Sequence, residues 1–184
     1  MSRAALVKPV LFALLGVNAA VYALNGRGTE TLDAVAWFAL LLLFEAETRW
    51  PCRTRMPGRG PVLLALRLAA ATAIAWAAVT FVRESAWLDA VNAWLWIGVV
   101  IVLELEVRAP STMARYRGAA VTLSMILYLG LVAVAVAWLV QREWFDGYDA
   151  LLWVAAFALL ERDLLGRLPG RSRHDPEARP DGLR

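Results

Sequence analysis

Six mostly apolar stretches of the chain are long enough, or nearly so, to cross a lipid bilayer as a helix, which takes about 20 residues. They cover residues 4–24, 32–50, 61–82, 87–107, 119–140 and 148–165. Hydrophobic residues make up 60% of the chain and charged residues only 19%, against about 45–50% and about 25% in a soluble domain. The sequence therefore predicts an all-α, polytopic membrane protein with six transmembrane helices.

These stretches define one membrane domain over residues 1–166, followed by a polar segment, 167–184, which we expect to be a disordered cytoplasmic tail. The first stretch follows Arg3 and Lys8 and also has features of a secretory signal peptide. We interpret it as a membrane span, because the repeat described below includes it as an ordinary member.

The positions of the basic residues predict the orientation. Of the 19 Lys and Arg residues, 16 lie in or near the two termini and the connections after the second and fourth stretches. Three lie in the other connections: Arg27, Arg83 and Arg142. Because Lys and Arg accumulate on the cytoplasmic side, both termini are expected to be cytoplasmic. The Arg-, Ala- and Gly-rich composition with a single Lys favours a GC-rich bacterial genome, so the expected location is a bacterial inner membrane.

Three segments share one ungapped pattern: Asp or Asn, Trp four residues later, Glu eight residues after that, and another acid two residues further on. The copies are Asp33, Trp37, Glu45 and Glu47; Asn92, Trp96, Glu104 and Glu106; and Asp149, Trp153, Glu161 and Asp163. The tryptophans are 59 and 57 residues apart, which is the length of a helical hairpin. The pattern predicts three repeated hairpins, at about 4–51, 61–110 and 118–166, around a pseudo-threefold axis.

The first Glu of each copy lies 12 residues after the Asp or Asn, or about 18 Å along a helix. This is less than the ~30 Å hydrocarbon thickness, so these carboxylates are expected inside the bilayer or at its cytoplasmic border. They also lie near helix C-termini, where the helix dipole disfavours negative charge. Four counter-charges are available at matching depth: Lys8, Arg67, Arg49 and Arg108.

Two functions fit this arrangement. In the first, Glu45, Glu104 and Glu161 line a cavity for protons, small cations or a cationic solute in a small transporter or channel. In the second, the acids and bases only hold the hairpins together, and the chain is an accessory or scaffold subunit of a larger membrane complex. The second acid of each copy faces the opposite way from the first, and spacing alone leaves open which one points inward.

The remaining features predict packing. Ala65, Ala69, Ala73 and Ala77 recur every four residues, a stripe that lets helices approach closely. The repeat tryptophans are interpreted as packing or interface residues, with a cation–π platform for a solute as the alternative.

Enzyme chemistry has little support in the sequence. With one His, His174, and one Cys, Cys52, the chain lacks the ligands for an embedded metal or haem site and the side chains of a nucleophilic triad. We therefore expect a non-enzyme without a cofactor or metal. The expected partners are anionic lipid head groups on the cytoplasmic side, with other membrane subunits or self-association left open and no nucleic acid.

Overall fold

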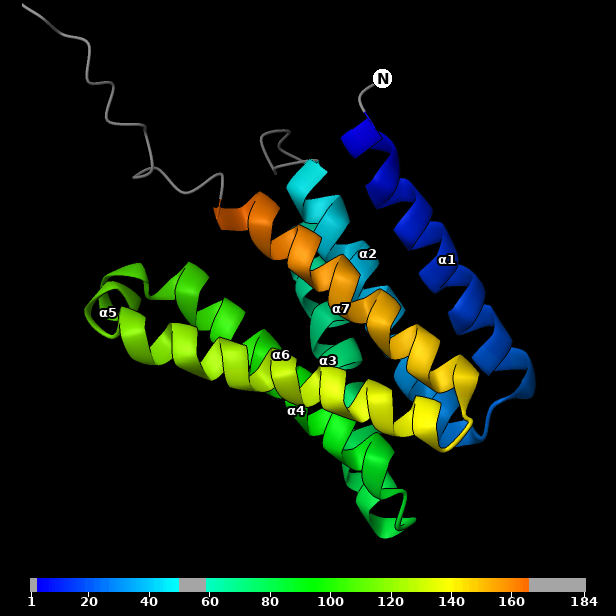
Figure 1. Cartoon of the computed structure of the whole chain (residues 1–184). Helices are drawn as coiled ribbons and strands as arrows, with labels where there is room; N and C mark the ends of the chain where they lie inside the picture. Colours follow the sequence, from blue (N-terminus) through cyan, green and yellow to red (C-terminus); the bar gives the residue numbers. More distant parts are fainter. Residues whose placement is uncertain (1–2, 50–58, 166–184) are drawn as a thin grey trace, which may run out of the picture.

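The structure is a computed structural model that describes residues 3–49 and 59–165 (Figure 1). Its helices are α1 (Arg3–Asn25), α2 (Gly28–Arg49), α3 (Arg59–Arg83), α4 (Trp87–Arg108), α5 (Pro110–Arg115), α6 (Arg117–Val140) and α7 (Trp144–Leu165). No strand occurs within these two ranges, so the all-α prediction is confirmed. The predicted tail at 167–184 lies outside the described residues.

Two helices begin one turn earlier than their apolar stretches. α2 starts at Gly28 and α7 at Trp144, whereas hydrophobicity predicts starts near 32 and 148. Each added turn carries an acid, Glu30 or Asp146, which is favourable at the positive end of a helix dipole. The connection between the fourth and fifth stretches also contains α5, whose Pro110 occupies the first helical turn, where its missing N–H is not needed.

The connections α3–α4 and α6–α7 repeat one tight turn. Each has a residue in the left-handed region, Ser85 with φ 57° and Arg142 with φ 69°. In each, a backbone N–H donates to the carbonyl oxygen five residues earlier. The N···O distance is 3.0 Å from Ala86 to Phe81 and 2.9 Å from Glu143 to Trp138. Such bonds satisfy the last carbonyls of a helix. The same backbone geometry thus joins the two helices of both hairpins.

The six long helices form a closed ring in chain order. α1 packs on α2, α2 on α3, α3 on α4, α4 on α6 and α6 on α7, and α7 returns to α1. Figure 1 shows this last contact, with α1 and α7 side by side. The second helices of the three hairpins, α2, α4 and α7, supply the centre of the bundle.

Three tryptophans meet at that centre. The ring centroids of Trp37 and Trp96 are 6.2 Å apart, those of Trp37 and Trp153 6.4 Å, and those of Trp96 and Trp153 6.5 Å. Phe157 joins them, with its ring centroid 4.7 Å from that of Trp96. Tilted and edge-to-face contacts at such distances are the favourable aromatic arrangements. The repeat tryptophans are therefore packed against one another rather than placed at a lipid interface.

Four of the described helices are long and apolar enough to cross a membrane, over Val7–Asn25, Pro61–Arg83, Trp87–Glu106 and Arg117–Val140. The predicted six spans are therefore not confirmed by length and composition. The difference comes from α2 and α7, which have acidic residues toward both ends: Glu30, Asp33, Glu45 and Glu47 on α2, and Asp146, Asp149, Glu161 and Asp163 on α7. These acids lower the mean hydropathy of both helices.

Large apolar side chains cover much of the outer surface. Val62, Leu64, Leu66 and Leu68 on α3 are each about half exposed, at 49–59%, and Leu129 on α6 is 65% exposed. Soluble monomers rarely expose continuous apolar patches of this kind. Together with the four apolar helices, this surface fits an integral membrane protein.

Candidate functional site

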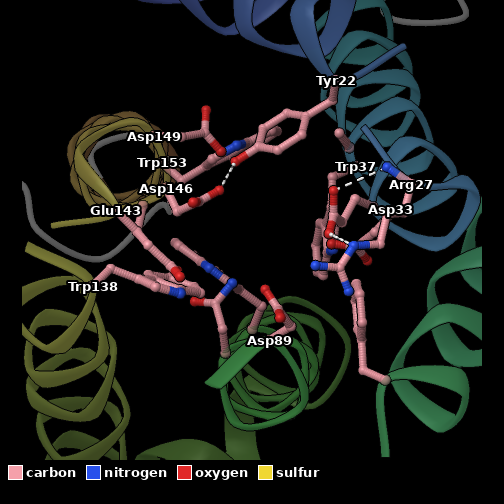
Figure 2. Close-up of a pocket in the computed structure, with 16 residues that line it drawn as sticks. Tyr22, Arg27, Asp33, Trp37, Asp89, Trp138, Glu143, Asp146, Asp149 and Trp153 are labelled. Carbon is pink, nitrogen blue, oxygen red and sulfur yellow. Dashed lines mark hydrogen bonds and ion pairs between the residues drawn. The ribbon is translucent and has the colours of Figure 1, made fainter. Parts of the chain in front are cut away.

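A cavity of about 230 Å³ lies at the end of the bundle where the three hairpins turn. All six long helices contribute to its wall, and Figure 2 shows the labelled side chains pointing toward it from opposite sides. The lining residues are Tyr22, Arg27, Glu30, Asp33, Ala34, Trp37, Phe81, Asp89, Asn92, Trp96, Trp138, Glu143, Asp146, Asp149, Ala150 and Trp153. We refer to this site as the acidic cavity.

The lining residues of α2, α4 and α7 form three layers of similar groups. From the turns inward, the layers are Glu30, Asp89 and Asp146; Asp33, Asn92 and Asp149; and Trp37, Trp96 and Trp153. Within every layer the three residues are 59 and 57 residues apart. Steps of three and four residues correspond to about 4.5 Å and about 6 Å along a helix. The cavity therefore has carboxylates toward its mouth and tryptophans at its inner end.

The first helices of the hairpins add aromatic side chains with the same spacing. Tyr22 on α1, Phe81 on α3 and Trp138 on α6 all line the cavity and are also 59 and 57 residues apart. Each therefore comes from the first helix of a different hairpin. Aromatic rings thus contribute to the wall as well as to the inner end.

The electrostatics of the lining are strongly negative. Six carboxylates line the cavity, from Glu30, Asp33, Asp89, Glu143, Asp146 and Asp149, against a single cationic side chain, Arg27. Arg27 Nε lies 3.5 Å from Glu30 Oε1, and the Arg27 side chain is 81% exposed, so this pair is weak. A concave site with one sign of charge concentrates counter-ions, so the acidic cavity should attract cations.

Two of these carboxylates are fixed by neutral donors. The Tyr22 hydroxyl donates to Asp146 Oδ1 at 2.6 Å, and the Asn18 side-chain amide donates to Asp149 Oδ1 at 2.7 Å. Both bonds join α1 to α7, where the helix ring closes. They orient the carboxylates without supplying a counter-charge.

Two other lining oxygens have no donor. Asp33 Oδ1 and Asn92 Oδ1 are buried, and neither accepts a hydrogen bond from the described residues. A buried acceptor without a partner costs about 1–3 kcal/mol, so native structures rarely contain one without a reason. Both atoms belong to the second layer, directly above the tryptophans.

The volume limits what the cavity can hold. A drug-sized ligand needs about 300–1,000 Å³, more than the roughly 230 Å³ available, whereas a single water needs only about 10–15 Å³. The space suits a small solute or a group of waters. Its walls combine carboxylates with aromatic rings, a pairing that favours organic cations.

Two of the three carboxylates expected to line a cavity, Glu45 and Glu104, do not line this one. Glu45 is buried, and its Oε2 lies 2.6 Å from Lys8 Nζ. Lys8, one of the predicted counter-charges, therefore forms an ion pair with it. Glu104 pairs with Arg108 one turn later, and its side chain is 46% exposed.

The other acidic and basic residues predicted at this end of the bundle are less completely described. Arg67 and Glu106 are partly buried on α3 and α4. The side chains of Glu47, Arg49, Glu161 and Asp163 lie outside the described part of the structure. The Asp33, Asn92 and Asp149 positions, marked only as polar members of the repeat, are the ones that line the acidic cavity.

Sequence reasoning missed the outer acidic layer, Glu30, Asp89 and Asp146, and the aromatic wall residues on α1, α3 and α6. The signal was available, because the spacing of 59 and 57 residues that aligns the tryptophans also aligns both sets. Glu30 and Asp146 precede the apolar stretches at 32–50 and 148–165, so hydropathy places both residues in the connections between helices. Hydropathy alone cannot recognise a polar helix turn that faces a cavity.

Among residues 3–49 and 59–165, no group of three or more Asp, Glu, His or Cys side chains is arranged to hold a metal ion. Comparison with known proteins finds no matching family model, no similar curated protein and no similar solved structure.

Proposed function

We propose that the chain crosses the membrane six times, as three hairpins related by a pseudo-threefold axis. Several observations support this arrangement. The helix ring closes in chain order. The inner helices α2, α4 and α7 are each 22 residues long, and their starts are 59 and 57 residues apart. The three ring-to-ring distances in the tryptophan layer differ by only 0.3 Å, from 6.2 to 6.5 Å.

The acids of α2 and α7 are compatible with membrane spans because of where they lie. Asp33, Asp146 and Asp149 face the acidic cavity, and Glu45 is buried against Lys8. Ionisable residues in membrane helices are tolerated when they face a bundle interior and have partners there. Both helices can therefore cross the bilayer despite their lower hydropathy.

The orientation follows from the basic residues, with both termini cytoplasmic in a bacterial inner membrane. The mouth of the acidic cavity, beside Arg27 and the turns at Ser85 and Arg142, then opens to the extracytoplasmic side. At the opposite end, Arg108, Arg115 and Arg117 are exposed around α5, where anionic lipid head groups would be attracted at about 1 kcal/mol per charge.

We propose that the chain is a small transporter that takes up a small organic cation through the acidic cavity. The observation that carries this proposal is the composition of the cavity wall, six carboxylates and one Arg together with aromatic side chains from all three hairpins. Carboxylates supply charge attraction and aromatic rings supply cation–π contacts. We assign this wall the binding and passage of a cation.

The second candidate, an accessory subunit held together by a structural ring of charges, is favoured by a different observation. Glu45 and Glu104 are engaged in ion pairs with Lys8 and Arg108. These pairs support a structural role for the acids and bases at this end of the bundle, but they do not account for the acidic cavity at the opposite end.

Uptake by reconstituted protein tests the proposed function. Full-length protein in liposomes would be given labelled guanidinium, a cation that stays charged at neutral pH, under an inside-negative potential. We expect saturable uptake that the Asp33→Asn, Asp149→Asn double variant reduces at least tenfold, because two cavity charges are removed. Glu104→Gln, which removes an acid at the other end, is the matched control and should retain uptake.

Uptake no greater than in empty liposomes would overturn the transporter assignment. Binding of guanidinium without uptake would point instead to a solute-binding subunit of a larger complex. Equal uptake by wild type and the double variant would show that the acidic cavity is not on the path.

A further inference from the structure

We propose that the acidic cavity selects cations that donate N–H hydrogen bonds, of which a protonated primary amine is the simplest. This inference rests on the proposed function and specifies its substrate class. It is carried by the two buried, donor-less oxygens of the second layer, Asp33 Oδ1 and Asn92 Oδ1.

Both oxygens are acceptors, so they are complementary to a donor. An ammonium group carries only donors, so it can supply the hydrogen bonds that these acceptors lack while placing its charge beside the Asp33 carboxylate. A quaternary ammonium has the same charge but no N–H, so it cannot donate a hydrogen bond to either acceptor. A site built to hydrogen-bond a ligand strongly rejects an analogue that lacks the hydrogen bond.

The neighbouring side chains support the same orientation. The Asp146 and Asp149 carboxylates on α7 already accept hydrogen bonds from Tyr22 and Asn18. The two oxygens without a donor lie across from them, on α2 and α4. Trp37 and Trp96 follow those oxygens one helical turn deeper and also line the cavity. An alkyl chain on the amine would meet these rings, while the ammonium group lies between the second layer and the mouth.

Four isomeric cations of equal charge distinguish recognition of N–H donors from recognition of charge alone. n-Butylammonium, diethylammonium, N,N-dimethylethylammonium and tetramethylammonium share one formula but carry three, two, one and no N–H groups. Each would be titrated into the purified full-length protein in detergent micelles by calorimetry. We expect affinity to fall along the series, with tetramethylammonium at least tenfold weaker than n-butylammonium.

The Asn92→Leu variant tests the assignment to a named oxygen. It removes one acceptor without changing the net charge, so it should lower the n-butylammonium affinity several-fold and leave tetramethylammonium nearly unchanged. Asn25→Leu is the matched control, because Asn25 is exposed at the end of α1 and does not line the cavity. The wild-type series decides the donor question even if Asn92→Leu fails to fold.

The outcomes separate the two proposals. Equal affinity for all four isomers overturns the selection for N–H donors and leaves cation binding in place. No binding of any isomer overturns both. A graded wild-type series with an unchanged ratio in Asn92→Leu would remove Asn92 from the site.

Discussion

At the scale of single residues, the ion pairs Lys8–Glu45 and Glu104–Arg108 each contain the first Glu of a repeat copy but differ in exposure. The Lys8 and Glu45 side chains are 24% and 10% exposed, whereas Glu104 and Arg108 are 46% and 74% exposed. Removing one member of a buried pair leaves a desolvated charge behind, while exposed pairs contribute little. The two pairs should therefore differ in their effect on stability.

Lys8→Met is expected to lower the free energy of unfolding by about 3–5 kcal/mol, because the buried Glu45 carboxylate loses its ion pair with Lys8. Glu104→Gln should change it by less than about 1 kcal/mol. Denaturant titration of the full-length protein in micelles measures both values. The double variant Lys8→Met, Glu45→Leu should recover most of the loss, and equal losses in the two single variants would contradict this account.

At the scale of helices, the alanine stripe predicted on α3 is only partly a packing surface. Ala65 and Ala69 are exposed, whereas Ala77 and its neighbour Ala78 are completely buried. They pack against Ala90 and other small residues of α4. The four-residue spacing predicts one packing face, but only the C-terminal end of the stripe, at Ala77, is buried.

Ala78→Leu should destabilise the protein by about 1–3 kcal/mol, because the larger side chain must force α3 and α4 apart. Ala69→Leu introduces the same change at an exposed position of the same helix and should stay within about 0.5 kcal/mol. Thermal unfolding followed by circular dichroism compares the two variants. A smaller loss at position 78 than at position 69 would show that the close α3–α4 contact is not formed.

The left-handed turn residues give another test at this scale. Ser85→Val should lower stability by about 1–2 kcal/mol, since a β-branched residue tolerates positive φ poorly. Ser85→Gly fits that backbone and should cause no loss. The pair is measured by the same unfolding assay, and a Val variant as stable as the Gly variant would contradict a positive φ at this position.

At the scale of the whole molecule, the sequence predicted the helices to within about one turn, because apolar length determines them directly. The repeat spacing predicts Trp37, Trp96 and Trp153 only as packing or interface residues, and their mutual contact is seen in the structure alone. The cavity was expected around Glu45 and Glu104 instead of Asp33 and Asp149. Which acid faces the interior depends on how each helix is rotated about its axis, and spacing along the chain does not contain that information.

The orientation can be tested on intact cells with a membrane-impermeant thiol reagent. In a Cys52→Ser background, Gln141→Cys in the α6–α7 turn should be labelled and Ser111→Cys in α5 should be protected until the cells are opened. Both positions are exposed, so access depends on the side of the membrane. The opposite labelling pattern would place the acidic cavity on the cytoplasmic side.

The most direct test of the central claim is the equilibrium binding of n-butylammonium to the purified full-length protein. The account predicts saturable binding that weakens at least tenfold in the Asp33→Asn, Asp149→Asn double variant. The variant removes the charge-assisted hydrogen bond to Asp33, which contributes about 1.5–3 kcal/mol, together with a second cavity charge, and about 1.4 kcal/mol is a factor of ten. Glu104→Gln should bind like wild type. Binding that is absent, or that the double variant leaves unchanged, would contradict a cation site in the acidic cavity.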